Sequence, residues 1–213
     1  MPSRPDIRLD VDKLALSRGD LPLIGGLKFS LGAGEALWLT GPNGIGKTSL
    51  LLACAGFLAA DDGHVRWSLG GDSRQARDLV AYSAHRGPER SGLTLGEDLA
   101  FWQSLYDDDR SMEERLRGVG LLGRHNTPVA GLSAGQKRRL GLARLLSSGR
   151  PAWLMDEPLS GLDVEGQALV TRAVGEHLAE GGLALIASHQ PVPIQGVTAR
   201  KLVMTASPVE GAA

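Results

Sequence analysis

The octapeptide Gly41-Pro42-Asn43-Gly44-Ile45-Gly46-Lys47-Thr48 decides the fold of this 213-residue chain. It matches the pattern G-x-x-x-x-G-K-[ST] of a phosphate-binding P-loop, in which backbone N–H groups surround the phosphates and the lysine reaches the β and γ oxygens. An apolar stretch at 35–40 (EALWLT) is typical of a strand before the loop, and 49–60 of a helix after it. Together with Ser49, the octapeptide predicts nucleotide binding, with the Thr48 hydroxyl as a Mg²⁺ ligand. A glycine-rich turn without a ligand is the alternative.

The composition indicates one domain that is large enough to bury a core and has no excess of either charge. The net charge is −1, and Cys54 is the single cysteine. We therefore expect no nucleic-acid partner, no intramolecular disulfide and a reducing compartment. The first ten residues lack the apolar stretch of a signal peptide, and the longest apolar run, 50–60, is too short to span a bilayer. We expect no direct membrane insertion, so that a role at a membrane would require a partner.

Apolar stretches alternate with helical patterns along the chain, which predicts an α/β domain with a mostly parallel sheet. Polar helical segments between about 86 and 147 indicate a helical insertion, and we expect disorder only at 207–213. The predicted strands are 7–16, 27–31, 35–40, 63–68, 79–84, 152–155 and 183–188. The predicted helices are 49–60, 95–106, 111–119, 133–147 and 164–179.

Two acidic residues follow the apolar strand 152–155, as ATP hydrolysis at a P-loop requires. Asp156 is placed to hold Mg²⁺, and Glu157 to polarise the attacking water. Adjacent carboxylates are common on protein surfaces, so the pair gains its meaning from the motifs around it. These are Leu132-Ser133-Ala134-Gly135-Gln136, Ser160-Gly161-Leu162-Asp163 and Ser188-His189.

The ordered set of the P-loop, LSAGQ, DEP, SGLD and SHQ resembles the ATP-binding subunit of ABC transporters over essentially the whole chain. The resemblance implies an α/β P-loop NTPase of the ABC cassette type, with 1–213 as a single nucleotide-binding domain. It implies a mostly parallel core sheet, an N-terminal antiparallel β region and a helical subdomain at about 86–147. It further implies an ATPase that uses ATP and Mg²⁺ and works as a homodimer of cassettes.

The resemblance also assigns roles to the motifs. The signature Ser133-Ala134-Gly135-Gln136 of one subunit would close over the ATP on the P-loop of the other, from a helix N-terminus that suits an anion. His189 would contact the γ-phosphate and help to position Glu157 and the water, while Asp163 would link the two active sites across the dimer. The expected catalytic residues are thus Lys47, Glu157 and His189, and the expected metal ligands are Thr48 and Asp156.

Two positions depart from the family pattern. Most relatives stack an aromatic residue on adenine where this chain has Arg18, although a guanidinium plane can also stack on a purine. Relatives also carry a glutamine that joins Mg²⁺ to the transport subunit, and ungapped counting places His85 there, followed by Arg86. We therefore expect Arg18 at the base, and His85 or Arg86 at the coupling position.

These departures, the short chain and the LSAGQ-Lys-Arg-Arg form make the chain similar to one branch of the family, the ATP-binding subunits of the cytochrome c maturation system, long called the haem exporter. This similarity implies a peripheral protein at the cytoplasmic face of a bacterial inner membrane. There it would power a polytopic permease partner in haem export or in the handling of a haem chaperone.

Other classes of protein share part of this set of motifs. The ATPase of another small-molecule ABC exporter, and an ABC-type ATPase without a transporter, share most of the motifs. A P-loop kinase would leave LSAGQ, SGLD and His189 unexplained. Against a nucleotide-binding interaction module, the complete set of Lys47, Asp156, Glu157 and His189 favours turnover. The run Lys137-Arg138-Arg139 is expected to be a solvated helix face. We expect only packing or ordinary surface roles for His64, His125, His177, Trp38, Trp67, Trp102 and Trp153.

Overall fold

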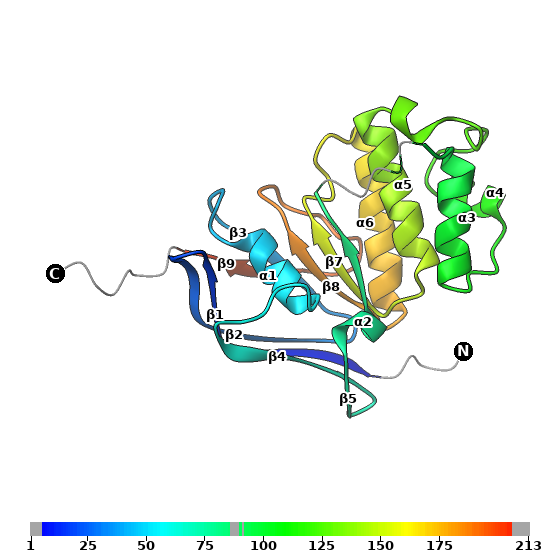
Figure 1. The fold of residues 1–213 in the computed structure, drawn as a ribbon. Coiled ribbons are helices and arrows are strands. Elements are labelled where there is room, and N and C mark those ends of the chain that lie inside the picture. Colours follow the sequence, from blue (N-terminus) through cyan, green and yellow to red (C-terminus); the bar gives the residue numbers. More distant parts are fainter. Residues whose placement is uncertain (1–5, 86–89, 91, 206–213) are drawn as a thin grey trace.

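The computed structural model describes residues 6–85, 90 and 92–205, and in it two sheets enclose a helix while further helices form a separate block (Figure 1). Arg86 and the C-terminal residues 207–213 lie outside the described residues. The predicted α/β class with its mostly parallel sheet, antiparallel N-terminal region and helical part is confirmed by these elements.

The N-terminal sheet is antiparallel, with strand order β2-β1-β4-β5. Its first strand alternates buried and exposed residues until Val11, where a bulge that includes Lys13 at φ 50° resets the register. Gly63 on β4 passes so close to this bulge that a Cβ there would lie 2.3 Å from the Lys13 carbonyl oxygen. The strands are β1 (Ile7–Arg18), β2 (Leu21–Gly32), β4 (Asp62–Leu69) and β5 (Asp72–Arg74).

The second sheet is parallel, with strand order β6-β7-β8-β3-β9. Every residue of β7 and β8 is buried, as expected for apolar strands with both faces covered. The last strand, β9, was not predicted because its sequence, RKLV, begins with two charges, yet it pairs with β3 at the sheet edge. The strands are β3 (Ala36–Thr40), β6 (Val80–Ser83), β7 (Ala152–Asp156), β8 (Leu183–Ala187) and β9 (Arg200–Val203).

The helices occupy two layers. Helix α1 (Lys47–Cys54) lies between the sheets and packs Leu50 and Leu51 into one core cluster (Figure 1). It ends at Cys54 instead of residue 60, because Gly56 turns the chain with a left-handed φ of 78°. The remaining helices are α2 (Ala76–Leu79), α3 (Leu95–Leu105), α4 (Met112–Gly118), the 3₁₀ turn η1 (Val129–Gly131), α5 (Ala134–Ser147) and α6 (Val164–Ala179). Helices α5 and α6 cover the far side of the parallel sheet, and α3 and α4 pack against α5, so that these helices share a second core cluster. The short helix α2 belongs to the first cluster through Leu79.

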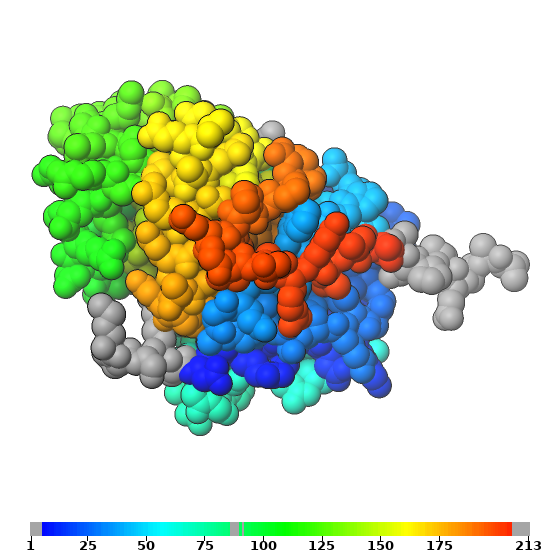
Figure 2. All heavy atoms as spheres, turned by 180° about the vertical axis from the view of Figure 1, so that it is seen from behind, coloured from blue at the N-terminus to red at the C-terminus, as the bar shows by residue number. Residues whose placement is uncertain are grey.

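Three helices begin with a reciprocal capping box, in which a serine or threonine and a side chain three residues later bond each other's backbone N–H. These caps explain why the predicted starts near 95, 111 and 133 agree with the structure. The pairs are Thr94 with Glu97, Ser111 with Glu114, and Ser133 with Gln136. On the opposite face of the molecule, α6 (yellow) and the orange-to-red C-terminal segment lie side by side (Figure 2).

Candidate nucleotide-binding and catalytic site

The P-loop joins β3 to α1, and its glycines are required by backbone geometry. Gly44 and Gly46 adopt φ values of 80° and 104°, which disfavour any residue with a Cβ. At Gly41 a Cβ would lie 2.5 Å from the carbonyl oxygen of Met204, just after β9. The loop therefore curls tightly in front of the N-terminus of α1, where unpaired N–H groups favour an anion.

The side chain of Lys47 lies back across this loop and is largely buried. Its Nζ donates hydrogen bonds to the carbonyl oxygens of Gly41, at 2.7 Å, and Pro42, at 3.0 Å. These bonds hold the ammonium group within the curl of the loop. The cation is thus positioned for the β and γ phosphates before a nucleotide arrives.

Thr48 and Asp156 supply two oxygens side by side at the meeting point of α1 and β7. The Thr48 hydroxyl donates to Asp156 Oδ2 at 2.8 Å, and Asp156 is buried. The Asp156 carboxylate also affects Tyr82. Burial of Tyr82 and, to a smaller degree, the negative charge of Asp156 raise the pKa of Tyr82 to about 12. Among the described residues no group of three acidic, histidine or cysteine side chains could enclose a metal. Two oxygens fit Mg²⁺, which protein sites commonly hold through one or two groups plus substrate phosphates.

Glu157 and His189 meet at the ends of the neighbouring strands β7 and β8. His189 Nδ1 lies 2.9 Å from Glu157 Oε2, and the His189 backbone N–H donates to Oε1 at 3.2 Å. The backbone N–H of Glu157 donates to the Ala187 carbonyl at 2.8 Å. Glu157 has φ 49°, a strained value for a non-glycine residue that costs about 1–3 kcal/mol and is often found at functional sites.

One pocket of about 600 Å³ brings these groups together. Arg18, exposed at the end of β1, stands at its edge with the apolar side chains of Leu21 and Leu23. His85, just after β6, also lines it, so that the two residues marked as departures both reach this pocket. The remaining lining residues are Asn43, Gly44, Gly46, Lys47, Thr48, Ser49, Asp156, Glu157 and His189.

The signature segment lies elsewhere, since none of the described residues that line the P-loop pocket belongs to 132–136. Ser133 is the N-cap of α5 and its Oγ accepts from the Gln136 N–H at 3.2 Å. Gly135 and Ala134 occupy the first turn of that helix. The structure therefore separates the two halves of the expected ATP site within one chain.

The run Lys137-Arg138-Arg139 is not the solvated face that the sequence predicted. Arg139 is only 12% exposed and bonds Asp163 Oδ1 at 2.9 Å, and Asp163 in turn caps α6 through the Gly166 N–H. Arg138 contacts His85, which sequence reasoning did not anticipate. The spacing of these basic residues does not predict their partners. Their place directly after the signature motif was the one signal that they have a role at the site.

Of the residues expected to have packing or ordinary surface roles, His177, Trp153 and Trp67 pack in the interior, while His64 lies at the surface beside Asp12 and Arg66. His177 is buried, stacks on Trp153 with ring centroids 4.0 Å apart, and bonds the Leu183 carbonyl at 3.2 Å. Trp67 is buried and donates to the Cys54 carbonyl at 2.8 Å. Trp38 donates to the carbonyl of Ser188 at 2.8 Å, and thereby fixes the chain directly before His189.

Comparison with known proteins identifies the family of this chain. The family model described as "ABC transporter" matches residues 24–160. The cytochrome c biogenesis ATP-binding export protein CcmA of Rhodobacter capsulatus is 46% identical over 181 residues, which cover 85% of this chain and 80% of that protein. The protein of the same name from Nitrobacter winogradskyi is 42% identical, and the match covers 92% of this chain and 97% of the relative.

Solved structures share the fold. A putative ABC transporter ATP-binding protein from Pyrococcus furiosus superposes with a TM-score of 0.78 at 21% identity, covering 92% of this chain and 97% of the other. An ATP-binding subunit of an ABC transporter gives a TM-score of 0.76 at 24% identity, covering 85% and 79% of the two chains. None of the helices in the described part of the chain is long and apolar enough to cross a membrane.

Proposed function

This chain belongs to the ABC transporter family, in the branch of the cytochrome c biogenesis ATP-binding export proteins, and we propose that it hydrolyses ATP to drive a membrane permease that serves cytochrome c biogenesis. The observation that carries the proposal is the pocket at the P-loop. There a lysine, a hydroxyl–carboxylate pair and a carboxylate–histidine pair surround one space.

Six residues of the pocket have roles that follow from their chemistry. Lys47 and the backbone N–H groups of the P-loop bind the β and γ phosphates. Thr48 and Asp156 would hold Mg²⁺, which when bound neutralises charge on the phosphate oxygens. Glu157 accepts a hydrogen bond from the attacking water and withdraws its proton, while His189 keeps the carboxylate in place. Arg18 lies against the base as a guanidinium plane.

The proposed active form is a homodimer of cassettes. Within one chain, Ser133 and its neighbours do not reach the P-loop pocket, so the signature is free to meet ATP bound by a second copy. The N-terminus of α5, with its Ser133 cap, suits the γ-phosphate. Asp163, which begins α6 and is 68% exposed, is available at the junction of the two sites.

The proposed setting is the cytoplasmic face of a bacterial inner membrane, where the chain sits as a peripheral subunit on a polytopic permease. The relatives are ATP-binding export proteins of cytochrome c biogenesis by name, which supports this setting. Haem export or the handling of a haem chaperone is the corresponding transport step. A cassette that serves another small-molecule exporter would have the same pocket.

The deciding experiment is genetic. A strain lacking this chain should lose covalent haem attachment to c-type cytochromes, visible by haem staining, while its b-type haemoproteins stay normal. Complementation with Lys47→Ala should fail although the subunit is present, because the permease requires the ATP-driven step. Complementation with Arg172→Met, an exposed change on α6, should succeed. Normal haem staining in the deletion strain would refute the cytochrome role and leave the ATPase assignment standing.

A further inference from the structure

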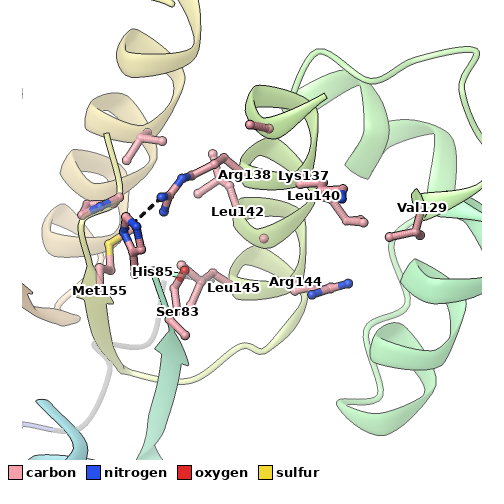
Figure 3. Close-up of a pocket in the computed structure, with 15 residues that line it drawn as sticks. Ser83, His85, Val129, Lys137, Arg138, Leu140, Leu142, Arg144, Leu145 and Met155 are labelled. Carbon is pink, nitrogen blue, oxygen red and sulfur yellow. Dashed lines mark hydrogen bonds between the residues drawn. The ribbon is translucent and has the colours of Figure 1, made fainter. Parts of the chain in front are cut away.

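Arg138 and His85 meet beside the P-loop pocket and join the signature helix to the end of β6. Arg138 Nη2 lies 3.2 Å from His85 Nδ1, and Figure 3 shows this contact spanning the space between α5 and the neighbouring strands. Arg138 comes two residues after the signature, and His85 two residues after β6. The contact therefore links two segments that differ by 53 positions in sequence.

The chemistry of the two groups fixes the direction of this hydrogen bond. A guanidinium group carries donors only and stays protonated, so it cannot accept a hydrogen bond from a ring nitrogen. Nδ1 of His85 must then be the acceptor, with its lone pair directed at Arg138. In the neutral ring the proton is consequently carried by Nε2.

His85 also faces the nucleotide site. It lines the P-loop pocket together with Thr48, Asp156 and Glu157. Arg138 is half-buried on the same side, and this burial lowers its pKa although the negative charges of Glu157 and Asp156 act to raise it. The pair thus stands between the signature helix and the catalytic carboxylates of its own chain.

From this geometry, and resting on the proposed ATPase function, we propose that Arg138 is a positioning residue that locks His85 in its Nε2–H tautomer. His85 then offers the nucleotide a hydrogen-bond donor for a phosphate oxygen, and no lone pair for the metal ion. An amide at this position would offer an oxygen as well as N–H groups. In this chain, His85 therefore contacts a phosphate oxygen of the nucleotide and does not contact the metal ion.

The tautomer can be measured directly in the full-length chain by long-range ¹H–¹⁵N NMR with ¹⁵N-labelled histidine. The sequence has five histidines, and His85→Gln identifies the signal of His85. We expect Nε2–H at His85 in the unmodified chain, a mixture of tautomers in Arg138→Met, and recovery of Nε2–H in Arg138→Lys, which also only donates. An Nδ1–H ring in the unmodified chain, or an unchanged tautomer in Arg138→Met, would overturn the proposal. Unchanged signals from the other histidines establish that the variants are folded.

Two functional readouts connect the tautomer to the reaction. Arg138→Met should lower kcat about 10–100-fold, the usual effect of losing a residue that orients a ligating or reacting group, with Arg138→Lys recovering most of it. Arg172→Met is the matched control for loss of one positive charge. His85→Gln, which introduces an amide oxygen, should lower the Mg²⁺ concentration needed for half-maximal ATP binding. If His85→Gln and the unmodified chain need the same Mg²⁺ concentration, the claim that His85 makes no contact with the metal ion is wrong.

These outcomes separate this inference from the proposed function. If the expected tautomer is found but the chain does not hydrolyse ATP, the proposed function fails and the positioning role of Arg138 stands. If ATP is hydrolysed at the same rate in Arg138→Met as in the unmodified chain, the positioning role fails and the ATPase function stands.

Discussion

Glu157 is held by His189 from two directions, by the ring at 2.9 Å and by the backbone N–H at 3.2 Å, although the two residues are 32 positions apart. They meet because β7 and β8 are neighbours in a parallel sheet, so their carboxyl ends lie at one edge. The arrangement fixes both oxygens of the carboxylate. A general base needs this fixed geometry relative to the water that it deprotonates.

Replacing this base should separate ATP binding from hydrolysis. Glu157→Gln keeps the shape and the hydrogen bond to the His189 N–H but removes the proton acceptor, so turnover should fall about 10²–10⁴-fold. Binding of a fluorescent ATP analogue should be retained. Lys47→Ala is the contrasting variant and should weaken binding itself. Near-normal phosphate release by Glu157→Gln would place the base elsewhere, with His189 as the next candidate.

Activity should depend on the concentration of the chain. Because the signature lies outside the P-loop pocket of its own chain, one chain lacks a complete site, and the specific activity should rise as dilute protein is concentrated. Sedimentation should find monomers without nucleotide, and dimers for Glu157→Gln in ATP and Mg²⁺. Specific activity that is constant on dilution, with no dimer in ATP, would contradict assembly in trans.

Recognition of the base should be loose. Arg18 lies exposed at the edge of the pocket, beside Leu21 and Leu23, where a guanidinium plane can stack on either purine. GTP should therefore compete appreciably with ATP, and Arg18→Ala should weaken both nucleotides to a similar degree. Arg18→Lys is the matched control, since it keeps the charge without the planar group. Unchanged affinities in Arg18→Ala would exclude the stacking role.

A buried ion pair stabilises the helical region. Arg115 bonds both carboxylate oxygens of Asp108 at 2.6 and 2.7 Å, with 7% and 6% of the two side chains exposed. Arg115→Met leaves a buried charge without its partner and should cost about 3–5 kcal/mol in denaturant unfolding. The exposed pair Arg117–Glu113 is the control, and Arg117→Met should cost less than about 1 kcal/mol. If Arg115→Met and Arg117→Met lower the free energy of unfolding equally, the pair of Arg115 and Asp108 is accessible to solvent and the prediction is wrong.

The same pair should make the fold sensitive to acid. Burial acts to raise the pKa of Asp108, but the hydrogen bonds and positive charge of Arg115 act against it, and the pKa is lowered. A lowered pKa in the folded state gives stability that is present above the unfolded value of about 3.9 and is lost as pH falls through the folded value. Asp108→Asn should remove this part of the pH dependence below about pH 4.

The sequence predicted those parts of the molecule in which local pattern and tertiary structure agree. Strands such as 152–155 and 183–188 are continuous apolar runs, and the helix starts near 95, 111 and 133 carry capping boxes, so local chemistry was sufficient. β9 was missed because its pairing with β3 outweighs its two charges. The partners of Arg138 and Arg139 were missed because a basic run does not reveal which distant side chains reach it.

A contact between Arg139 and Asp163 connects the signature helix to α6. Arg139 follows the signature within α5, whereas Asp163 caps α6, and their bond at 2.9 Å joins the two segments that the proposed dimer places at its active sites. Gly120 makes room for this arginine, since a Cβ there would lie 2.5 Å from Arg139 Nη1. The geometry therefore ties the placement of the signature helix to the start of α6.

Arg139→Ala should lower ATP hydrolysis while leaving nucleotide binding to the monomer unchanged, because the P-loop pocket contains neither residue of the pair. The expected loss is about 10-fold, at the low end for a residue that orients others. Arg139→Lys should recover part of it, and Gly120→Ala should resemble Arg139→Ala by displacing the guanidinium. The decisive measurement is a double-mutant cycle on turnover with Asp163→Asn, which keeps a capping oxygen for the Gly166 N–H. We expect the effects of Arg139→Ala and Asp163→Asn on turnover to be strongly coupled. If the two effects simply add, the contact between these residues does not connect the signature helix to α6.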